Sequence, residues 1–100
     1  MQSIGGDSGR PRRRAFVPAG HRAVLIDLGA LFPSAPHFSG TYHPDGLQIR
    51  SVRLGVLTEW GIDEWGAWFG KVSYTVVAKG REEKVTHWVP AWALRPADTR

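Results

Sequence analysis

This chain of 100 residues contains no cysteine, which excludes a disulfide framework and any zinc site built on thiolates. It has no apolar run approaching the roughly 18 residues that cross a membrane. Residues 1–7 (MQSIGGD) lack the apolar core of a signal peptide. We therefore expect a soluble, cytoplasmic protein without membrane contact. Because the length suffices for one domain at most, stability has to come from a modest hydrophobic core.

Helical periodicity is also missing, because no stretch repeats its apolar residues at the spacing of a normal-length amphipathic helix. Short apolar or alternating runs separated by glycine and proline predict β-strands instead. A change of alternation at Arg50–Ser51 predicts a β-bulge or a strand bend there. The expected fold is all-β, a small barrel whose closure removes exposed strand edges. Strands are expected within residues 23–28, 47–60, 67–78 and 84–89, with loops at 29–46 and 61–66, a hairpin connection at 79–83 and a 3₁₀ turn near 90–94.

Acidic residues are scarce where the basic residues gather. The net charge is +4, and residues 1–22 hold five arginines against one aspartate, whereas the rest of the chain carries equal numbers of basic and acidic side chains. Residues 1–14 consist mainly of Gly, Ser, Pro and Arg, which offer too little apolar surface to offset the entropy of ordering a chain. The sequence therefore predicts a disordered basic tail over residues 1–15 and one domain over residues 16–98.

Tryptophan, in contrast, is abundant, and all five tryptophans lie between residues 60 and 92. Three of them, Trp60, Trp65 and Trp68, are interleaved with carboxylates in the stretch 59–68. Each tryptophan carries a large apolar face and one N–H that needs a partner. A domain this small cannot easily bury five such side chains, so part of the cluster is expected to form a half-exposed aromatic surface. Such a surface favours binding over catalysis.

The stretch from Trp68 to Leu94 resembles the second half of an SH3-like barrel. Trp68-Phe69 stands where such domains carry an aromatic pair at the opening of the central strand. Residues 79–83 match their distal hairpin, and Val89-Pro90-Ala91-Trp92-Ala93-Leu94 is similar to their closing 3₁₀ step. The resemblance implies a barrel of about five strands. It also implies a groove, since in SH3 domains an aromatic floor packs against polyproline II turns while acidic loop residues pair with a flanking arginine.

The predicted site is an aromatic–acidic surface that binds a protein or a Pro/Arg-rich peptide. Trp65, between Glu64 and Gly66 in a loop, is the side chain most expected to contact a ligand. In the alternative interpretation, Trp60, Trp68 and Trp88 are mostly core and the carboxylates only solvate a loop. The candidate ligand-binding residues are Trp60, Trp65, Trp68, Trp92, Glu59, Asp63 and Glu64.

A second hypothesis is nucleic-acid binding, in which tail arginines neutralise phosphates and aromatic side chains stack on bases. Its candidate residues are Arg10, Arg12, Arg13 and Arg14. Val72, Tyr74 and Trp88 are expected to share a sheet face with Lys71 and Lys84 for this purpose. The balanced charge of the domain places this hypothesis second. The tail could equally dock on an acidic surface or remain solvated, and a homo-oligomer would supplement the small core.

No motif predicts catalysis, a metal or a cofactor. His37 and His43 flank the long loop with Asp45 nearby, but their spacing matches no metal-site motif. Residues 85–94 are also similar to the closing segment of type II dihydrofolate reductases, which are SH3-like barrels with Gln-Ile-Tyr at the substrate pore. Thr86-His87-Trp88 occupies the equivalent place here, so the glutamine that orients the ligands is missing. The sequence therefore predicts a binding module and no enzyme.

Overall fold

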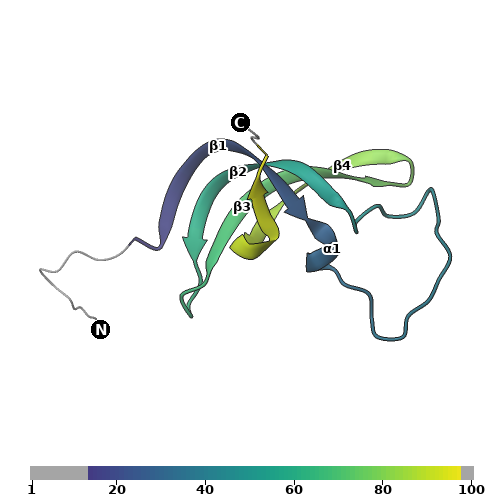
Figure 1. The fold of residues 1–100 in the computed structure, drawn as a ribbon. Coiled ribbons are helices and arrows are strands. Elements are labelled where there is room, and N and C mark those ends of the chain that lie inside the picture. The colour runs from purple at the N-terminus through teal and green to yellow at the C-terminus, as the bar shows by residue number, and fades with distance from the viewer. Residues whose placement is uncertain (1–13, 98–100) are drawn as a thin grey trace, which may run out of the picture.

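The computed structural model describes residues 14–97, which form one sheet of five antiparallel strands (Figure 1). The strand order is β4-β3-β2-β1-β5, so the first four strands are neighbours in sequence order and the short last strand returns to pair with β1. The predicted all-β fold and the predicted 3₁₀ turn are both confirmed. The elements are β1 (Phe16–Asp27), α1 (Leu28–Leu31), β2 (Val52–Ile62), β3 (Trp68–Ala78), β4 (Arg81–Pro90), the 3₁₀ turn η1 (Ala91–Ala93) and β5 (Leu94–Pro96).

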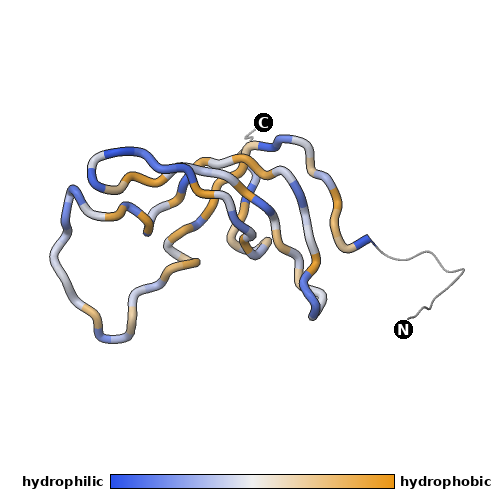
Figure 2. The backbone as a smooth tube through the Cα atoms, turned by 180° about the vertical axis from the view of Figure 1, so that it is seen from behind, coloured by the Kyte–Doolittle hydropathy of each residue, from blue (hydrophilic) through white to orange (hydrophobic). Residues whose placement is uncertain are grey.

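The hairpin of β3 and β4 is the most regular part of the sheet. It closes through Lys79 and Gly80, both with positive φ (56° and 75°). That conformation suits a two-residue turn, because its twist matches the twist of the flanking strands. Hydrophilic residues gather at this hairpin (Figure 2). The strand expected over residues 67–78 is confirmed almost to the residue. The strand expected over 84–89 is longer, from Arg81 to Pro90, because the connection expected over 79–83 is only the two residues 79–80.

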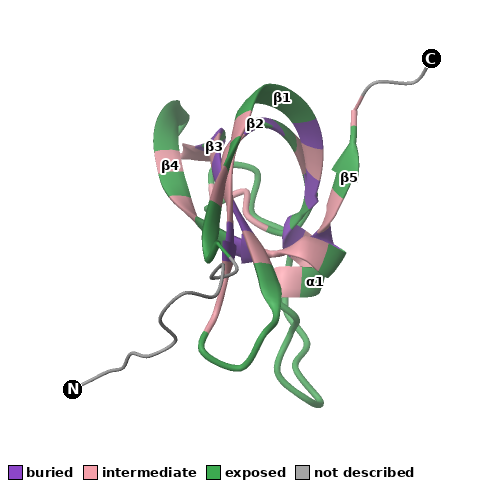
Figure 3. Ribbon diagram, turned by 90° about the vertical axis from the view of Figure 1, so that its left-hand side faces the viewer, coloured by how far each residue is buried: buried purple, intermediate pink, exposed green. Residues whose placement is uncertain are grey.

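The strands arch over η1, and the inner face of this arch carries the core (Figures 1 and 3). Strict alternation along β3 turns every second residue inward, as a half-buried strand requires. Full burial of one such aliphatic or aromatic side chain contributes about 1.5–3 kcal/mol. The buried set draws on six elements and consists of Val24, Ile26, Leu28, Leu57, Val72, Tyr74, Val76, Val89 and Ala93.

Two irregularities bend the sheet at the same level. The pairing of β1 with β2 shifts between Pro18 and Arg22, and the pairing of β2 with β3 shifts between Leu57 and Glu59. In β1 the change is accommodated by Gly20, whose φ is +72°. Extra residues in one strand of an antiparallel pair increase its local twist and re-aim the side chains that follow. The two bulges therefore give the sheet its arch.

At Arg50–Ser51, where a bulge or a strand bend was predicted, the chain bends just ahead of β2, and the β-bulge alternative is wrong. The strand predicted over 47–60 begins only at Val52, and Gln48 forms a separate bridge with Val77. The sequence analysis also missed α1, a single helical turn capped by the Asp27 carboxylate, which accepts a hydrogen bond from the Ala30 amide (3.1 Å). A helix of four residues is too short to show the repeat of apolar residues by which a helix is predicted from sequence.

The long loop between α1 and β2 runs outward from the sheet (Figure 1). Two side chains brace it. The Arg50 guanidinium donates to the Phe32 carbonyl (2.7 Å) and to the Ser34 hydroxyl (3.0 Å). The Gln48 amide donates to the carbonyls of His43, Pro44 and Gly46 (3.4, 3.3 and 3.1 Å).

The domain boundary predicted near residue 16 falls where the described chain begins. The Ala15 carbonyl accepts a hydrogen bond from the Ile62 amide (2.9 Å), so Ala15 is already tied to β2. Residues 1–13 of the predicted tail, with Arg10, Arg12 and Arg13, lie outside the described residues. Within residues 14–97 the helices are too short to cross a membrane.

Candidate functional site

Trp60 occupies the point where the sheet bends. It follows the bulge in β2 and pairs with Gly70 of β3 and Val17 of β1. An added Cβ atom at Gly70 would stand 2.7 Å from Leu57, 2.8 Å from Leu94 and 3.3 Å from Cζ3 of Trp60. The missing side chain at Gly70 therefore makes room for the two leucines and for the edge of the indole. Trp60 is partly buried against the core, with one part of the indole left open on the inner side of the sheet.

One side of Trp60 borders a shallow apolar hollow of about 360 Å³, whose other walls are Trp68 and Ala91. Trp68 opens β3 and lies on the same face of the sheet as Trp60 by strand alternation. Ala91 opens η1, and its small side chain leaves space between the two indoles. The hollow thus presents two aromatic faces and a methyl group.

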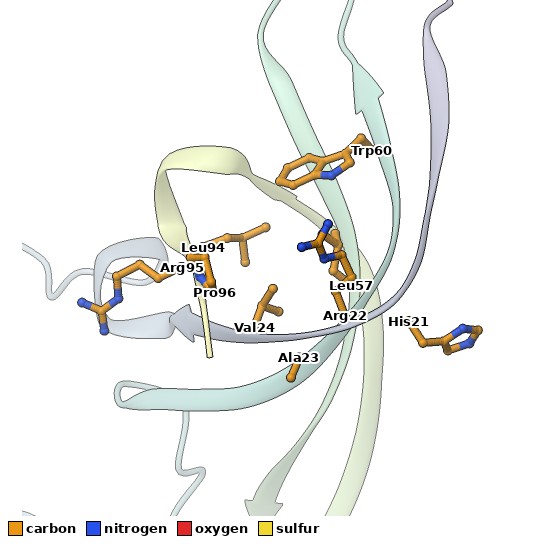
Figure 4. Close-up of a pocket in the computed structure, with 9 residues that line it drawn as sticks. All are labelled: His21, Arg22, Ala23, Val24, Leu57, Trp60, Leu94, Arg95 and Pro96. Carbon is orange, nitrogen blue, oxygen red and sulfur yellow. The ribbon is translucent and has the colours of Figure 1, made fainter. Parts of the chain in front are cut away.

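Another side of Trp60 borders a second hollow, of about 440 Å³, between β1 and β5 (Figure 4). Apolar side chains from three strands line it together with the indole, and its rim is basic. Trp60 borders both hollows, and we call the two together the Trp60 groove. Its residues are Trp60, Trp68 and Ala91 at one end and Val24, Leu57, Leu94, Pro96, His21, Arg22, Ala23 and Arg95 at the other.

Arg22 reaches this groove because it has the same strand parity as the buried residues Val24 and Ile26. It pairs with Leu57 at the start of the regular stretch that follows the bulge in β1. Its guanidinium extends toward Trp60, whereas His21 and Arg95 point away from the indole (Figure 4). Sequence analysis counted Arg22 only as part of the basic N-terminal segment. The available signal was the alternation of the strand, because Arg22 has the same parity as Val24 and Ile26.

The five tryptophans are divided among different surfaces. Trp65 is 89% exposed in the turn before β3 and Trp92 is 70% exposed on η1, so the expected exposure of Trp65 is confirmed. The interpretation of Trp68 and Trp88 as mostly core is wrong, since they are 41% and 39% exposed. Trp60 is the one tryptophan that packs against the buried cluster.

The three predicted carboxylates do not converge on the groove. Glu59 pairs with Lys71 on the outer face, opposite to the face of Trp60. The Asp63 carboxylate is occupied by its own turn, where it accepts hydrogen bonds from the amides of Trp65 (2.8 Å) and Ala67 (2.9 Å). Glu64 is exposed in the same turn. The aromatic half of the predicted aromatic–acidic surface is therefore assembled around Trp60, and the acidic half is not.

The outer face carries an aromatic cluster of its own. The rings of Phe16 and Trp88 lie 5.8 Å apart, and both approach Gly61, where an added Cβ would stand 3.0–3.1 Å from their atoms. Lys71 is the cross-strand neighbour of Trp88. The prediction that Val72 and Tyr74 share this face is wrong, because both are buried on the inner face. The sequence correctly placed Val72 and Tyr74 on one face of β3. It could not show that Trp88 of β4 lies opposite Lys71, and so on the other face, because that depends on how the two strands pair.

Tyr74 and His87 form a polar pair on the inner face. The Tyr74 hydroxyl and Nε2 of His87 are 2.9 Å apart, and their rings lie 5.5 Å apart. Burial lowers the pKa of the His87 imidazole and raises the pKa of the Tyr74 phenol. Both groups are therefore neutral near pH 7, which lets them share a hydrogen bond within the core. The pair satisfies buried polar atoms and faces no nucleophile.

No cluster that could hold a metal ion is formed by the His, Asp and Glu residues of positions 14–97. Comparison with protein-family models, curated proteins and solved structures finds no match to this chain. The groove residues themselves are therefore the basis on which a function can be argued.

Proposed function

We propose that this protein is a non-catalytic binding module that holds an extended segment of a protein or peptide in the Trp60 groove. One observation carries the proposal: Trp60, Trp68 and Ala91 border an open apolar hollow of about 360 Å³ on the surface of a rigid sheet. Aromatic side chains of this kind supply large contact areas at low cost in conformational entropy, which is why they dominate binding hot spots. Strands and η1 hold all three residues, so the surface is already formed before a ligand arrives.

We further propose that the domain is an SH3-like barrel. The strand order β4-β3-β2-β1-β5, the tight β3–β4 hairpin and the 3₁₀ turn before a short last strand support this assignment. Trp68 at the start of β3 and Pro90 just before η1 then occupy the positions at which such barrels contact peptides. The predicted Pro/Arg-rich ligand, however, needs carboxylates beside the aromatic floor. Glu59 lies on the outer face opposite Lys71, and the Asp63 carboxylate accepts a hydrogen bond within its own turn.

The test is a selection of binding peptides from a random library of 12-residue segments, followed by substitution of Trp68. We expect Trp68→Ala to weaken the selected peptide about tenfold or more, as loss of a hot-spot aromatic does. The free energy of unfolding should change by about 1 kcal/mol at most, because the side chain is 41% exposed. Titration calorimetry and urea denaturation measure the two quantities. Unchanged affinity, or a loss of affinity that only follows unfolding, would contradict the proposal.

Trp65→Ala is the matched comparison, because Trp65 belongs to the turn that leads into β3 and is 89% exposed. Its substitution should leave the free energy of unfolding within about 0.5 kcal/mol of the wild type. If Trp65→Ala weakens the peptide as much as Trp68→Ala does, the ligand extends beyond the groove and over the 63–67 turn, as the sequence predicted.

Nucleic-acid binding remains the second candidate, and the outer aromatic cluster favours it. Trp88 stands beside Lys71, and Arg14 precedes Phe16 by two residues, so a basic chain leads directly to a surface where bases could stack. Titration with oligo(dT) between 50 and 200 mM salt tests this candidate, because each neutralised phosphate steepens the salt dependence. We expect deletion of residues 1–13 to flatten the slope. Absence of binding at low salt would eliminate the candidate.

A further inference from the structure

We propose that the segment bound in the Trp60 groove carries a carboxylate, which pairs with the Arg22 guanidinium while a neighbouring apolar side chain lies between Trp60 and Trp68. This inference rests on the proposed peptide-binding function and specifies the chemistry of the ligand. It reverses the charge that the SH3 resemblance implies, because that resemblance calls for acidic residues on the domain and a basic ligand.

The charge of the groove is the first argument. The nine residues that line the larger hollow include Arg22, Arg95 and His21 and no aspartate or glutamate. The nearest predicted carboxylates are directed elsewhere, since Glu59 faces outward opposite Lys71 and Asp63 accepts hydrogen bonds within its own turn. Of the three basic side chains, Arg22 alone extends its charged group toward Trp60 (Figure 4), so a basic ligand would meet a like charge there and an anion a complementary one.

The placement of Arg22 is the second argument. It lies on the inner face opposite Leu57, with the parity of Val24, and its guanidinium extends toward Trp60 (Figure 4). Beneath it lies an apolar floor formed by Val24 and Leu57, which are 5% and 2% exposed. A guanidinium at the edge of an apolar floor can bind a carboxylate through two parallel hydrogen bonds, while the carbon skeleton of the ligand covers the floor.

The order of the two subsites is the third argument. Trp60 borders both hollows, so an extended segment that fills the Trp60–Trp68–Ala91 hollow with one side chain passes Trp60 and continues toward Arg22. A residue of extended chain spans about 3.3 Å, so a segment of a few residues can pass along the Trp60 side chain and contact both hollows. The ligand is thus a segment with an apolar residue and, within a few positions of it, Asp, Glu or a free C-terminal carboxylate.

The experiment uses the full chain and two random 12-residue libraries, one with free C-termini and one with the segments embedded within a carrier chain. We expect enrichment of an apolar residue next to an acidic residue or a terminal carboxylate. Enrichment in both libraries identifies side-chain carboxylates as the source, and enrichment confined to free C-termini identifies the terminal carboxylate. Enrichment of arginine or lysine beside the apolar residue would overturn the inference and leave the proposed function standing.

Arg22→Gln then tests the pairing on the selected peptide. We expect a loss of affinity of about tenfold or more, as for removal of one charge-assisted hydrogen-bonding partner. Replacement of the peptide carboxylate by an amide should cause a similar loss in the wild type and little further loss in Arg22→Gln. Arg22→Lys should recover part of the affinity, because it restores the charge without the planar fork.

Arg81→Gln is the matched control, because it removes the same charge from the β3–β4 hairpin, away from the groove. Equal losses in Arg22→Gln and Arg81→Gln would overturn the inference, since they would show only a dependence on net charge. Competition by oligo(dT) that depends on Arg22 would also overturn it in favour of phosphate recognition. If no peptide is enriched, or if Trp68→Ala has no effect on one that is, the proposed function itself fails and the inference fails with it.

Discussion

At the scale of single residues, Tyr74 and His87 show how a small core accommodates polar atoms. Each satisfies the other through one hydrogen bond of 2.9 Å on the inner face of the sheet. The arrangement avoids the cost of about 1–3 kcal/mol that an unsatisfied buried donor or acceptor carries. It also couples the fold to pH, because burial favours the neutral imidazole and lowers its pKa.

We expect the free energy of unfolding to fall as the pH drops below about 6.5, the ordinary pKa of histidine. In that range His87 takes up a proton more readily in the unfolded chain than in the folded one, so acid favours unfolding. At alkaline pH the raised pKa of the Tyr74 phenol has a similar effect. Tyrosine loses its proton more readily in the unfolded chain, so the free energy of unfolding should fall as the pH rises above 10. Urea denaturation at pH 7.5 and pH 5.5, in wild type and His87→Gln, measures the acid effect. Equal pH dependence in the two proteins would show that His87 is not its source.

At the scale of elements, the bulge in β1 divides the strand into two regular stretches, both paired with β2. The stretch before the bulge ends at Pro18 and the stretch after it begins at Arg22, so the side-chain alternation of one does not continue into the other. Gly20 makes the shift possible, because its φ of +72° is a conformation that L-residues seldom adopt. An added Cβ at Gly20 has no heavy atom within 4 Å, so only the backbone resists a substitution.

We expect Gly20→Val to lower the free energy of unfolding by about 1–2 kcal/mol, the cost of a left-handed conformation for a residue with a branched Cβ. Gly20→Asn should cost clearly less, because asparagine tolerates this region. Thermal unfolding of the two variants gives the comparison. Similar losses for valine and asparagine would mean that space, and not backbone conformation, restricts this position.

Much of the element layout was predictable from the sequence, and the reasons are local. β3 alternates strictly and the hairpin carries Lys79-Gly80, so both were identified. The bulges were not, because a bulge depends on the partner strand as much as on its own. The aromatic part of the groove was predictable from the tryptophans. The position of Arg22 opposite Leu57 was not, because it depends on the pairing of β1 with β2 in the folded sheet.

At the scale of the whole molecule, the sheet is apolar on both faces but buried on one. In β2, Leu57 is 2% exposed on the inner face, whereas Leu54 is 65% exposed on the outer face. Val52, Val56 and Trp88 are further large apolar residues of the outer face that remain exposed. The stability of the monomer therefore depends on one layer of side chains beneath an arch, and each member of that layer carries a large share of it.

The two leucines of β2 test this one-sided arrangement with the same substitution. Leu57→Ala should lower the free energy of unfolding by about 2–5 kcal/mol, because it leaves a cavity in the core. Leu54→Ala should stay within about 0.5 kcal/mol of the wild type, since its side chain is mostly in contact with water. Urea denaturation at several protein concentrations measures both. A large loss for Leu54→Ala that grows with concentration would show that a second copy of the chain covers the outer face.

The position of Trp60 between two hollows has a thermodynamic consequence. A ligand group that settles in one hollow restricts the rotation of the shared indole, and the second group then binds to a ring whose freedom is already reduced. The conformational entropy of the Trp60 side chain is therefore lost only once, although two ligand groups contact it. Affinity for a ligand with both features should therefore exceed what its two fragments predict separately, so a single side chain can make the groove selective for a combination of groups.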